Sequence, residues 1–458
     1  MHIDFRSRIY EIYMQSEAFM DNNVVQLFNP PPQPRRIAQA IRVGFSEHLQ
    51  AEHLIGSNKL TAQRFVIEAA HATRHAHLLQ TLRDAGAEIV LDTNVAELSV
   101  PGRFSGSMKD SPWAVDGRML DADDVKPGTN KSVIEPIARF AVKEGFTAVQ
   151  APTHFLADEK VDWLSADLRS AEALRIALDR EGGSHIAVDY PLIVSYAQLR
   201  NPAFRRLVRE GLSNTPGDYL WIRASGFGGN ATATGIARYI EAVHSFHDLE
   251  RPIMADQVGG LAAMAACAFG ATSGYASGID SKQKFDATSW LKTDKRGGGG
   301  GGKRIYIPGL DRTLPIEDAR AMFNDARTSR QFLGCSDPSC CGSIEKMLAN
   351  PEAHRLVQEE RAVAALSNTP ESVRTDEFRK YVEQRRQDAQ RSTRLKNASE
   401  AMQKTLAGSA KRLELIEDQL KGLHERTGQP GFAPEALLRV GQAPSKPGGS
   451  EGKSGRQP

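Results

Sequence analysis

The pattern of apolar and polar positions divides the chain into a helical start, a long alternation of strands and helices, and a charged helical end. In residues 1–84, apolar residues recur at intervals of three and four, which predicts helices. From Glu88 onward, short apolar runs alternate with amphipathic stretches of helix length, which is the signature of βαβ units and a parallel sheet. The runs lie at residues 88–94, 147–155, 185–194, 219–227, 252–260, 271–279 and 304–311.

Seven or eight strands of this kind favour a closed barrel. No GxGxxG glycine motif follows the first run, which argues against an open nucleotide-binding sheet. The sequence therefore predicts an α/β fold built on a (β/α)8 TIM-type barrel, whose functional face is the one at the carboxyl ends of the strands.

Length and net charge exclude few classes of protein. The chain has 458 residues and a formal net charge of +2, which is too small to identify a partner by itself. No run of about 18 apolar residues occurs, so we expect no transmembrane helix and no membrane partner. The N-terminus mixes acidic and basic residues without an apolar segment, so we expect no secretory signal and a cytoplasmic location.

Three of the four cysteines cluster in a way that is typical of a metal site. Cys335, Cys340 and Cys341 lie within seven residues, and His354 follows on the next predicted helix. In a large cytosolic chain this clustering favours a metal over a disulfide framework. Three thiolates and one imidazole form a closed set for structural zinc, with no open position for catalysis. The alternative is three ordinary buried cysteines.

Acidic residues stand at the ends of several predicted strands. Asp92, Asp189 and Asp256 each follow an apolar run. A buried carboxylate is costly unless it is paired or has a role. We therefore expect these three side chains to converge on one mouth of the barrel and to serve nucleophilic or acid/base chemistry. The alternative is that each one caps the following helix or holds a neighbouring arginine.

The C-terminal tail combines basic residues with an apolar stripe. Residues 374–396 hold eight Lys/Arg against four acids, and a loop of six glycines at 297–302 is also flanked by Lys and Arg. Together they suggest contact with a nucleic-acid backbone, with a solvated helix as the alternative. Further on, a heptad stripe predicts either a coiled-coil seam, open to a homodimer or a partner protein, or a face that packs on the barrel. The stripe consists of Met402, Leu406, Leu413, Ile416, Leu420 and Leu423.

These observations define five regions. We expect an N-terminal helical region (1–84), the (β/α) barrel (85–311), a zinc-binding segment (312–370), a basic helical tail with the coiled-coil stripe (371–428) and a disordered end (429–458). We also expect a barrel that stays folded when the tail from 371 onward is removed.

The layout of strand-end carboxylates followed by clustered cysteines resembles a known enzyme family. The segments that carry the likeness are AEIVLDTNVAELSVPG (87–102), VGGLAAM (258–264), GCSDPSCC (334–341) and EAHRLVQEERAVAALSNTP (352–370). They resemble the tRNA-guanine transglycosylases, and most of all their divergent DNA-modifying relatives, which insert 7-deazaguanine bases into DNA.

The resemblance implies a pentosyltransferase that replaces guanine in DNA or tRNA by a 7-deazaguanine through a covalent Asp-glycosyl intermediate. It implies Asp256 as the nucleophile, with Asp280 and Asp311 as alternatives, and Asp92 as the acid/base. The residues expected to bind the substrate base are Asp189, Gln257, Gly259 and Gly260. Two other hypotheses stay open: a barrel lyase acting on a small metabolite, and a non-catalytic, zinc-containing barrel that binds nucleic acid.

Overall fold

The computed structural model describes residues 33–157, 161–292, 302–325, 327–395, 398–428 and 430–439. The chain divides into two compact units between Pro34 and Arg35, and the second unit contains every element described below.

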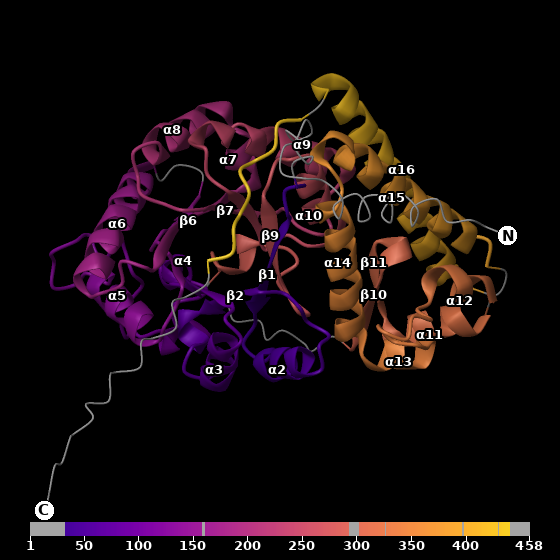
Figure 1. The fold of residues 1–458 in the computed structure, drawn as a ribbon, viewed down its shortest axis with the longest axis horizontal. Helices are drawn as coiled ribbons and strands as arrows, with labels where there is room; N and C mark the ends of the chain where they lie inside the picture. Colours follow the sequence, from indigo (N-terminus) through magenta and orange to yellow (C-terminus); the bar gives the residue numbers. More distant parts are fainter. Residues whose placement is uncertain are drawn as a thin grey trace, which may run out of the picture. The chain divides into compact units, whose positions relative to one another are not determined.

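Eight parallel strands close into a barrel (Figure 1). The order around the barrel is β1-β2-β3-β4-β6-β7-β8-β9, and β9 pairs with β1 to complete the circle, with Ala40 opposite Ala276. A short strand β5 (Phe155–Leu156) extends β6 on one side. The barrel strands are β1 (Ala38–Val43), β2 (Arg64–Glu68), β3 (Glu88–Asp92), β4 (Ala148–Gln150), β6 (Ala187–Ser195), β7 (Leu220–Ser225), β8 (Ile253–Asp256) and β9 (Gly274–Gly278).

Helices follow the strands and cover the outside of the barrel. Helix α8 shows how the sequence sets one of them: Asn201 caps its first turn through Oδ1, Pro202 begins it, and Phe204, Val208 and Leu212 form its buried face. The covering helices are α2 (His48–Gly56), α3 (Ala76–Asp84), α4 (Val95–Leu98), α5 (Ile134–Lys143), α6 (Val161–Arg180), α7 (Tyr196–Arg200), α8 (Pro202–Leu212), α9 (Ala233–His244) and α10 (Gly260–Ala268).

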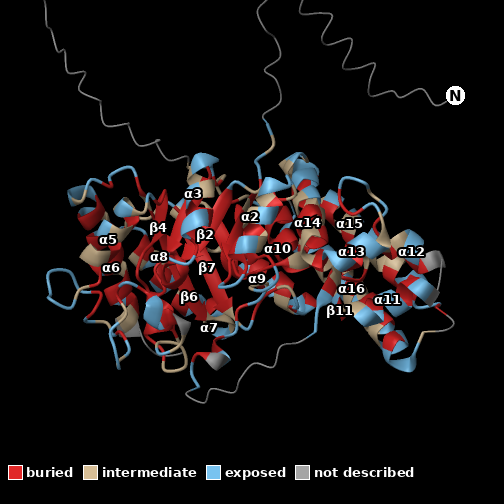
Figure 2. Ribbon diagram, turned by 90° about the horizontal axis from the view of Figure 1, so that it is seen from below, coloured by how far each residue is buried: buried red, intermediate tan, exposed pale blue. Residues whose placement is uncertain are grey.

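The strands are buried on both faces, as Figure 2 shows by colour. Inside the barrel, the middle layer is apolar and includes Ala40, Val66, Trp221 and Met254. Charged side chains lie at both ends of this layer, because alternate residues of each strand point inward. The interior is therefore a packed core with two ionic ends.

The chain beyond the barrel forms a hairpin and a group of helices. Strands β10 (Arg304–Ile307) and β11 (Arg312–Pro315) pair antiparallel. The helices are α11 (Ile316–Asp325), α12 (Arg327–Leu333), α13 (Ile344–Ala349), α14 (Pro351–Ser367), α15 (Glu371–Ser392) and α16 (Glu400–Thr427). No helix among the described residues has both the length and the apolar character that crossing a membrane requires.

Two expectations about the barrel were wrong. Residues 38–43 and 64–68 are the first two barrel strands, so the barrel begins at Ala38 and not at residue 85. Short runs buried on both faces lack the alternation of a half-buried strand, and periodicity alone does not separate them from a buried helix. Residues 304–311 belong to the hairpin, because β9 already pairs with β1 and leaves no opening for a further strand. Residues 1–32 of the expected helical region lie outside the described residues.

The heptad stripe of α16 is buried within the chain, against α15 and the barrel helix α9. This confirms the packing alternative for that face. After α16, residues 430–439 cross the amino-terminal end of the barrel as an extended strap (Figure 1). Most of the glycine loop and residues 440–458 of the expected disordered end lie outside the described residues.

Candidate functional site

Two arginines and two aspartates form a buried ionic layer at the carboxyl ends of the strands. Arg42 on β1 and Arg223 on β7 each contact both Asp92 on β3 and Asp256 on β8. The Nη1 atom of Arg42 lies 2.7 Å from Asp92 Oδ2, and Arg223 Nη2 lies 2.7 Å from the same oxygen. Asp256 accepts from Arg42 at both oxygens and from Arg223 Nε at 2.8 Å.

This layer controls the charge state of its carboxyl groups. Burial alone would raise the pKa of Asp92, but the guanidinium groups of Arg223 and Arg42 lower it to about 2. The same two arginines lower the pKa of Asp256 against the effect of its burial. Glu97, in the short helix after β3, has the opposite balance: burial and the charge of Asp92 raise its pKa to about 7. Its Oε1 lies 3.4 Å from Arg223 Nη1.

Asp92 and Asp256 therefore lie at the same end of the barrel, as expected, but both carboxylates are bound by the same two arginines. Asp256 is fully buried and Asp92 is 5% exposed. Sequence reasoning missed Arg42, because its strand was assigned to a helix. The signal that could have identified it was the strand count: seven runs lay after residue 85, one fewer than the eight strands of the expected barrel.

Asp189 lies at the opposite end, which corrects its assignment to the same mouth. Strand β6 continues for six residues beyond it, to Ser195, so this aspartate is near the start of its strand. Its carboxylate accepts from the indole of Trp221 at 2.9 Å and from Arg439 of the strap at 2.6 Å. Arg439 also contacts Glu88, at 2.6 Å. Asp189 is thus part of the closure of the barrel's amino-terminal end.

The turn after β8 carries the other residues expected to bind a base. Gln257 and Gly260 have positive φ angles of 55° and 61°, so the chain turns sharply here before helix α10 begins. The N–H group of Gly259 donates to the carbonyl of Gln283 at 3.1 Å, which joins this turn to the loop after β9. The turn reaches a cavity, which Gly260 lines.

A cavity of about 470 Å³ lies between the barrel's carboxyl face and the C-terminal helices. The barrel contributes the loops after β7, β8 and β9, and the other wall comes from the β10–β11 hairpin, α14 and α16. At Gly228, a Cβ atom would lie 2.5 Å from the Cα atom of Lys284, so glycine permits the close approach of two of these loops. The charged residues of the lining are Asp280, Lys284, Arg304, Asp311, Arg312, Glu352, Arg355, Glu359 and Arg412.

Two ion pairs neutralise part of this lining. Asp311 pairs with Arg412 and accepts from the Tyr306 hydroxyl at 2.7 Å. Arg355 lies 2.6 Å from Glu359. Asp280, two residues after β9, and Glu352, at the start of α14, have no ion-pair or side-chain hydrogen-bond partner for their carboxylates within the described part of the chain. The cavity therefore contains two free carboxylates, one of them among the alternatives named from the sequence.

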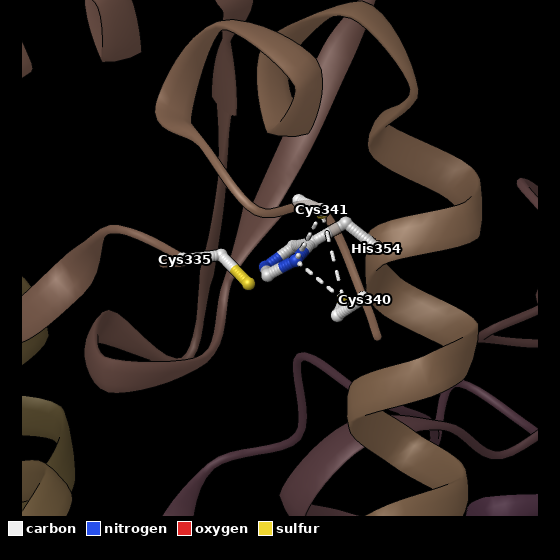
Figure 3. A group of neighbouring side chains, drawn as sticks. All are labelled: Cys335, Cys340, Cys341 and His354. Carbon is white, nitrogen blue, oxygen red and sulfur yellow. Dashed lines mark hydrogen bonds between the residues drawn. The ribbon is translucent and has the colours of Figure 1, made fainter. Parts of the chain in front are cut away.

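Cys335, Cys340, Cys341 and His354 come together as predicted (Figure 3). All four are buried, and their ligand atoms lie within 4.8 Å of one another. The Sγ atoms of Cys340 and Cys341 are 3.5 Å apart, and they lie 3.5 and 3.4 Å from His354 Nδ1. A tetrahedral site with zinc–sulfur bonds of about 2.3 Å would separate two sulfurs by about 3.8 Å and sulfur from nitrogen by about 3.6 Å. The residues present fit such an ion.

A tight turn explains how two adjacent cysteines can point to one centre. The carbonyl of Asp337 accepts from the N–H groups of Cys340 and Cys341 at 3.1 and 3.0 Å, and from Gly342 at 2.7 Å. The Asp337 side chain accepts from the N–H of Ser339 and pairs with Arg361 on α14. The turn is thereby attached to the helix that supplies His354.

The basic residues of α15 are largely engaged within the chain. Arg374 is buried and donates to the carbonyl of Arg35 at 2.7 Å, and Arg386 pairs with Glu417 of α16. Arg379, Lys380 and Arg391 pair with acids on their own helix. This arrangement leaves less free positive charge on α15 than the sequence suggests, and Lys396 lies outside the described residues.

The chain matches no protein-family model and no curated protein.

Proposed function

We propose that the protein is a base-exchange transglycosylase, which replaces guanine in nucleic acid by a 7-deazaguanine through a covalent Asp-glycosyl intermediate. The observation that carries the proposal is the pair of free carboxylates, Asp280 and Glu352, in one cavity at the carboxyl face of a barrel. Exchange at a sugar carbon needs one carboxylate to attack and a second to transfer protons. A cavity of this volume accommodates a nucleoside.

The proposal assigns attack to Asp280, because it stands two residues after β9, at the carboxyl face where barrels carry their catalytic groups. Its carboxylate oxygen bonds to C1′ while the C1′–N9 bond breaks, and the electron pair leaves with guanine, which takes a proton from Glu352. The incoming 7-deazaguanine then returns a proton to Glu352. A ring nitrogen of the incoming base bonds to C1′ as the bond between C1′ and Asp280 breaks. This step regenerates the enzyme, and no oxidant or reductant is needed.

Asp256 and Asp92 fit a positioning role better than the catalytic roles implied by the resemblance. Attack by Asp256 would require it to give up guanidinium contacts at both oxygens in a site without solvent access. A carboxyl group with a pKa of about 2, as in Asp92, is a weak general base near neutral pH. We therefore assign to this pair the role of holding β3 and β8, and with them the barrel mouth, in place.

A denaturing gel after incubation with guanine-containing DNA or tRNA tests the proposal. We expect wild type to form a covalent adduct and Asp280→Asn to form none and to lose exchange. Glu352→Gln should still form the adduct and exchange about 10²–10⁴-fold more slowly. Asp248→Asn, which changes a carboxylate that is 80% exposed outside the cavity, is the matched control and should behave as wild type.

Other outcomes point elsewhere. An active Asp280→Asn protein refutes the assignment of the nucleophile, and Asp256→Asn is then the next variant. Nucleic-acid binding with no adduct and no exchange in wild type supports the non-catalytic barrel. Turnover of a small metabolite with no nucleic-acid binding supports the lyase. The same assay with DNA and with tRNA in parallel identifies which nucleic acid is the acceptor.

We also propose that the Cys3His group holds a structural zinc ion through three sulfurs and His354 Nδ1. The donor set is closed and buried, so the ion would stabilise the fold of the segment and take no part in the exchange reaction.

A further inference from the structure

The cations that line the cavity fall into two groups. Arg355 and Arg412 are neutralised by Glu359 and Asp311. Lys284, Arg304 and Arg312 are not neutralised to the same degree. Within the described residues, the Arg304 side chain donates one hydrogen bond, to the carbonyl of Thr313 at 3.1 Å, and Lys284 lies 3.7 Å from Asp286. Arg312 has no carboxylate partner within the described ranges of the chain.

These cations stand on well-anchored backbone. The hairpin that carries both arginines buries Ile305, Ile307 and Leu314 in the core. The contact between Tyr306 and Asp311, together with the Asp311–Arg412 pair, fixes the hairpin to α16. The backbone that carries the arginines is therefore held in place before any ligand binds, which lowers the cost of binding.

The facing wall adds backbone donors. Helix α10 begins at the cavity with Gly260, and its N-cap residue, Gly259, provides no side-chain cap. The first N–H groups of such a helix, together with its dipole, favour an anion. The helix end and these three cations line one cavity, whose charged side chains are five Lys/Arg and four Asp/Glu.

We propose that Arg304 and Arg312, with Lys284, bind a phosphoryl group, namely the backbone phosphate next to the nucleotide whose base is exchanged. Planar guanidinium groups match the geometry of phosphate oxygens and donate two hydrogen bonds at once. This inference rests on the proposed function for the identity of the ligand, because a free mononucleotide carries the same phosphoryl chemistry.

The test compares the affinity of the double variant Arg304→Gln/Arg312→Gln for a short single-stranded oligonucleotide with that of wild type, over a range of salt concentrations. Loss of two phosphate contacts should reduce the slope of log affinity against log salt by about 1.4 and weaken binding by about 10-fold at low salt. Arg304→Lys/Arg312→Lys keeps the charge and should recover most of the slope. The matched control is Arg139→Gln/Arg320→Gln, two arginines that are 58% and 50% exposed outside the cavity lining, and it should leave the slope nearly unchanged.

Guanosine monophosphate is the second probe and separates the two sources of phosphate. If binding of the oligonucleotide depends on Arg304 and Arg312, the ligand is a backbone phosphate. If only binding of the mononucleotide depends on these arginines, the site holds the phosphate of a free nucleotide. An unchanged slope in the Gln/Gln variant, or a wild-type protein that binds neither probe, overturns the inference. The Asp280→Asn protein should keep the wild-type slope. If wild type shows the arginine dependence without any exchange, the proposed function fails while the phosphate site stands.

Discussion

At the scale of single residues, a third carboxyl group lies beside the ionic layer. Arg42 and Arg223 balance Asp92 and Asp256, and the remaining carboxyl group is that of Glu97. Because burial and the charge of Asp92 raise its pKa to about 7, Glu97 keeps its proton in the folded protein well above the pH at which it would lose it in the unfolded chain.

This difference predicts a pH-dependent stability. Between about pH 4.5 and 7 the unfolded chain binds fewer protons at Glu97 than the folded protein, so the free energy of unfolding should fall as pH rises through this window. Glu97→Gln imitates the protonated group. It should match wild type near pH 4.5 and exceed it above pH 7, by about 3 kcal/mol at most. Urea unfolding of both proteins from pH 4.5 to 8 measures this, and parallel curves would show that Glu97 ionises normally.

The sequence predicted which carboxylates lie at the strand ends but not what they do there. The convergence of Asp92 and Asp256 followed from the rule that strand ends meet at one face of a barrel. Their neutralisation depends on Arg42, on a strand that periodicity misassigned, and such contacts between distant segments leave no local pattern. That the Glu352 carboxylate is free in the cavity likewise depends on the tertiary structure, because the sequence around it is that of an ordinary residue in the first turn of a helix.

At the scale of elements, the strap at residues 430–439 closes the amino-terminal end of the barrel. Arg35 donates to the carbonyls of Phe432 and Ala433, and the hydroxyl of Tyr219 donates to the carbonyl of Leu437. Arg439 then enters the barrel end, where its guanidinium meets Glu88 and Asp189, both fully buried. The composition of this segment suggested disorder. The hydrogen bonds that hold it are to partners more than 200 residues away, and composition does not reveal such partners.

Arg439→Ala should destabilise the protein strongly. The change leaves Glu88 paired with Arg64 and leaves Asp189 with no ion-pair partner among the described residues. Removing one side of a buried ionic network costs about 3–5 kcal/mol. The matched control is Arg426→Ala, whose ion pair with Glu241 is exposed and should contribute about 1 kcal/mol or less. Denaturant midpoints compare the two, and equal midpoints would mean that the strap does not stabilise the barrel.

The turn that carries Cys340 and Cys341 is a second element with a direct test. We expect about one zinc ion per chain in wild type. Cys340→Ser/Cys341→Ser removes two of the four proposed ligands, so the purified variant should lack the ion and unfold more easily. Cys267→Ser is the control for cysteine number, because this residue lies in α10 and not in the cluster. Elemental analysis gives the metal content. Unchanged zinc in the double variant would refute the site.

The two misassigned strands show the limit of pattern analysis for elements. The barrel strands β3, β4, β6, β7, β8 and β9 were identified because helices of ordinary length separate their apolar runs. In β1 and β2, arginine and glutamate stand within the strands, and these charges point into the barrel. The resulting mixture of apolar and charged residues imitates an amphipathic helix. Only the requirement that a barrel close could have reassigned them.

At the scale of the whole molecule, the C-terminal helices are part of the barrel's structure. Helix α16 packs on α9, and Arg412 donates from it to the carbonyls of Gly229 and Ala231 in the loop after β7. Helix α15 contacts α10, where the Thr375 hydroxyl donates to the carbonyl of Ala268. The tail that looked separable in the sequence therefore covers two barrel helices, one wall of the cavity and, through the strap, the other end of the barrel.

A chain that ends at residue 370 should consequently fail to fold as an isolated barrel. It loses the cover of α9 and α10 and the counter-charge for Glu88 and Asp189. Each fully buried apolar side chain contributes about 1.5–3 kcal/mol, while a domain's net stability is about 5–15 kcal/mol, so the loss of several such contacts exceeds the margin. A chain that ends at residue 439 keeps every described contact and should unfold like the full protein. Soluble yield and thermal unfolding of the two chains decide the matter: a sharp, cooperative transition in the 1–370 chain would show that the barrel is an independent domain after all.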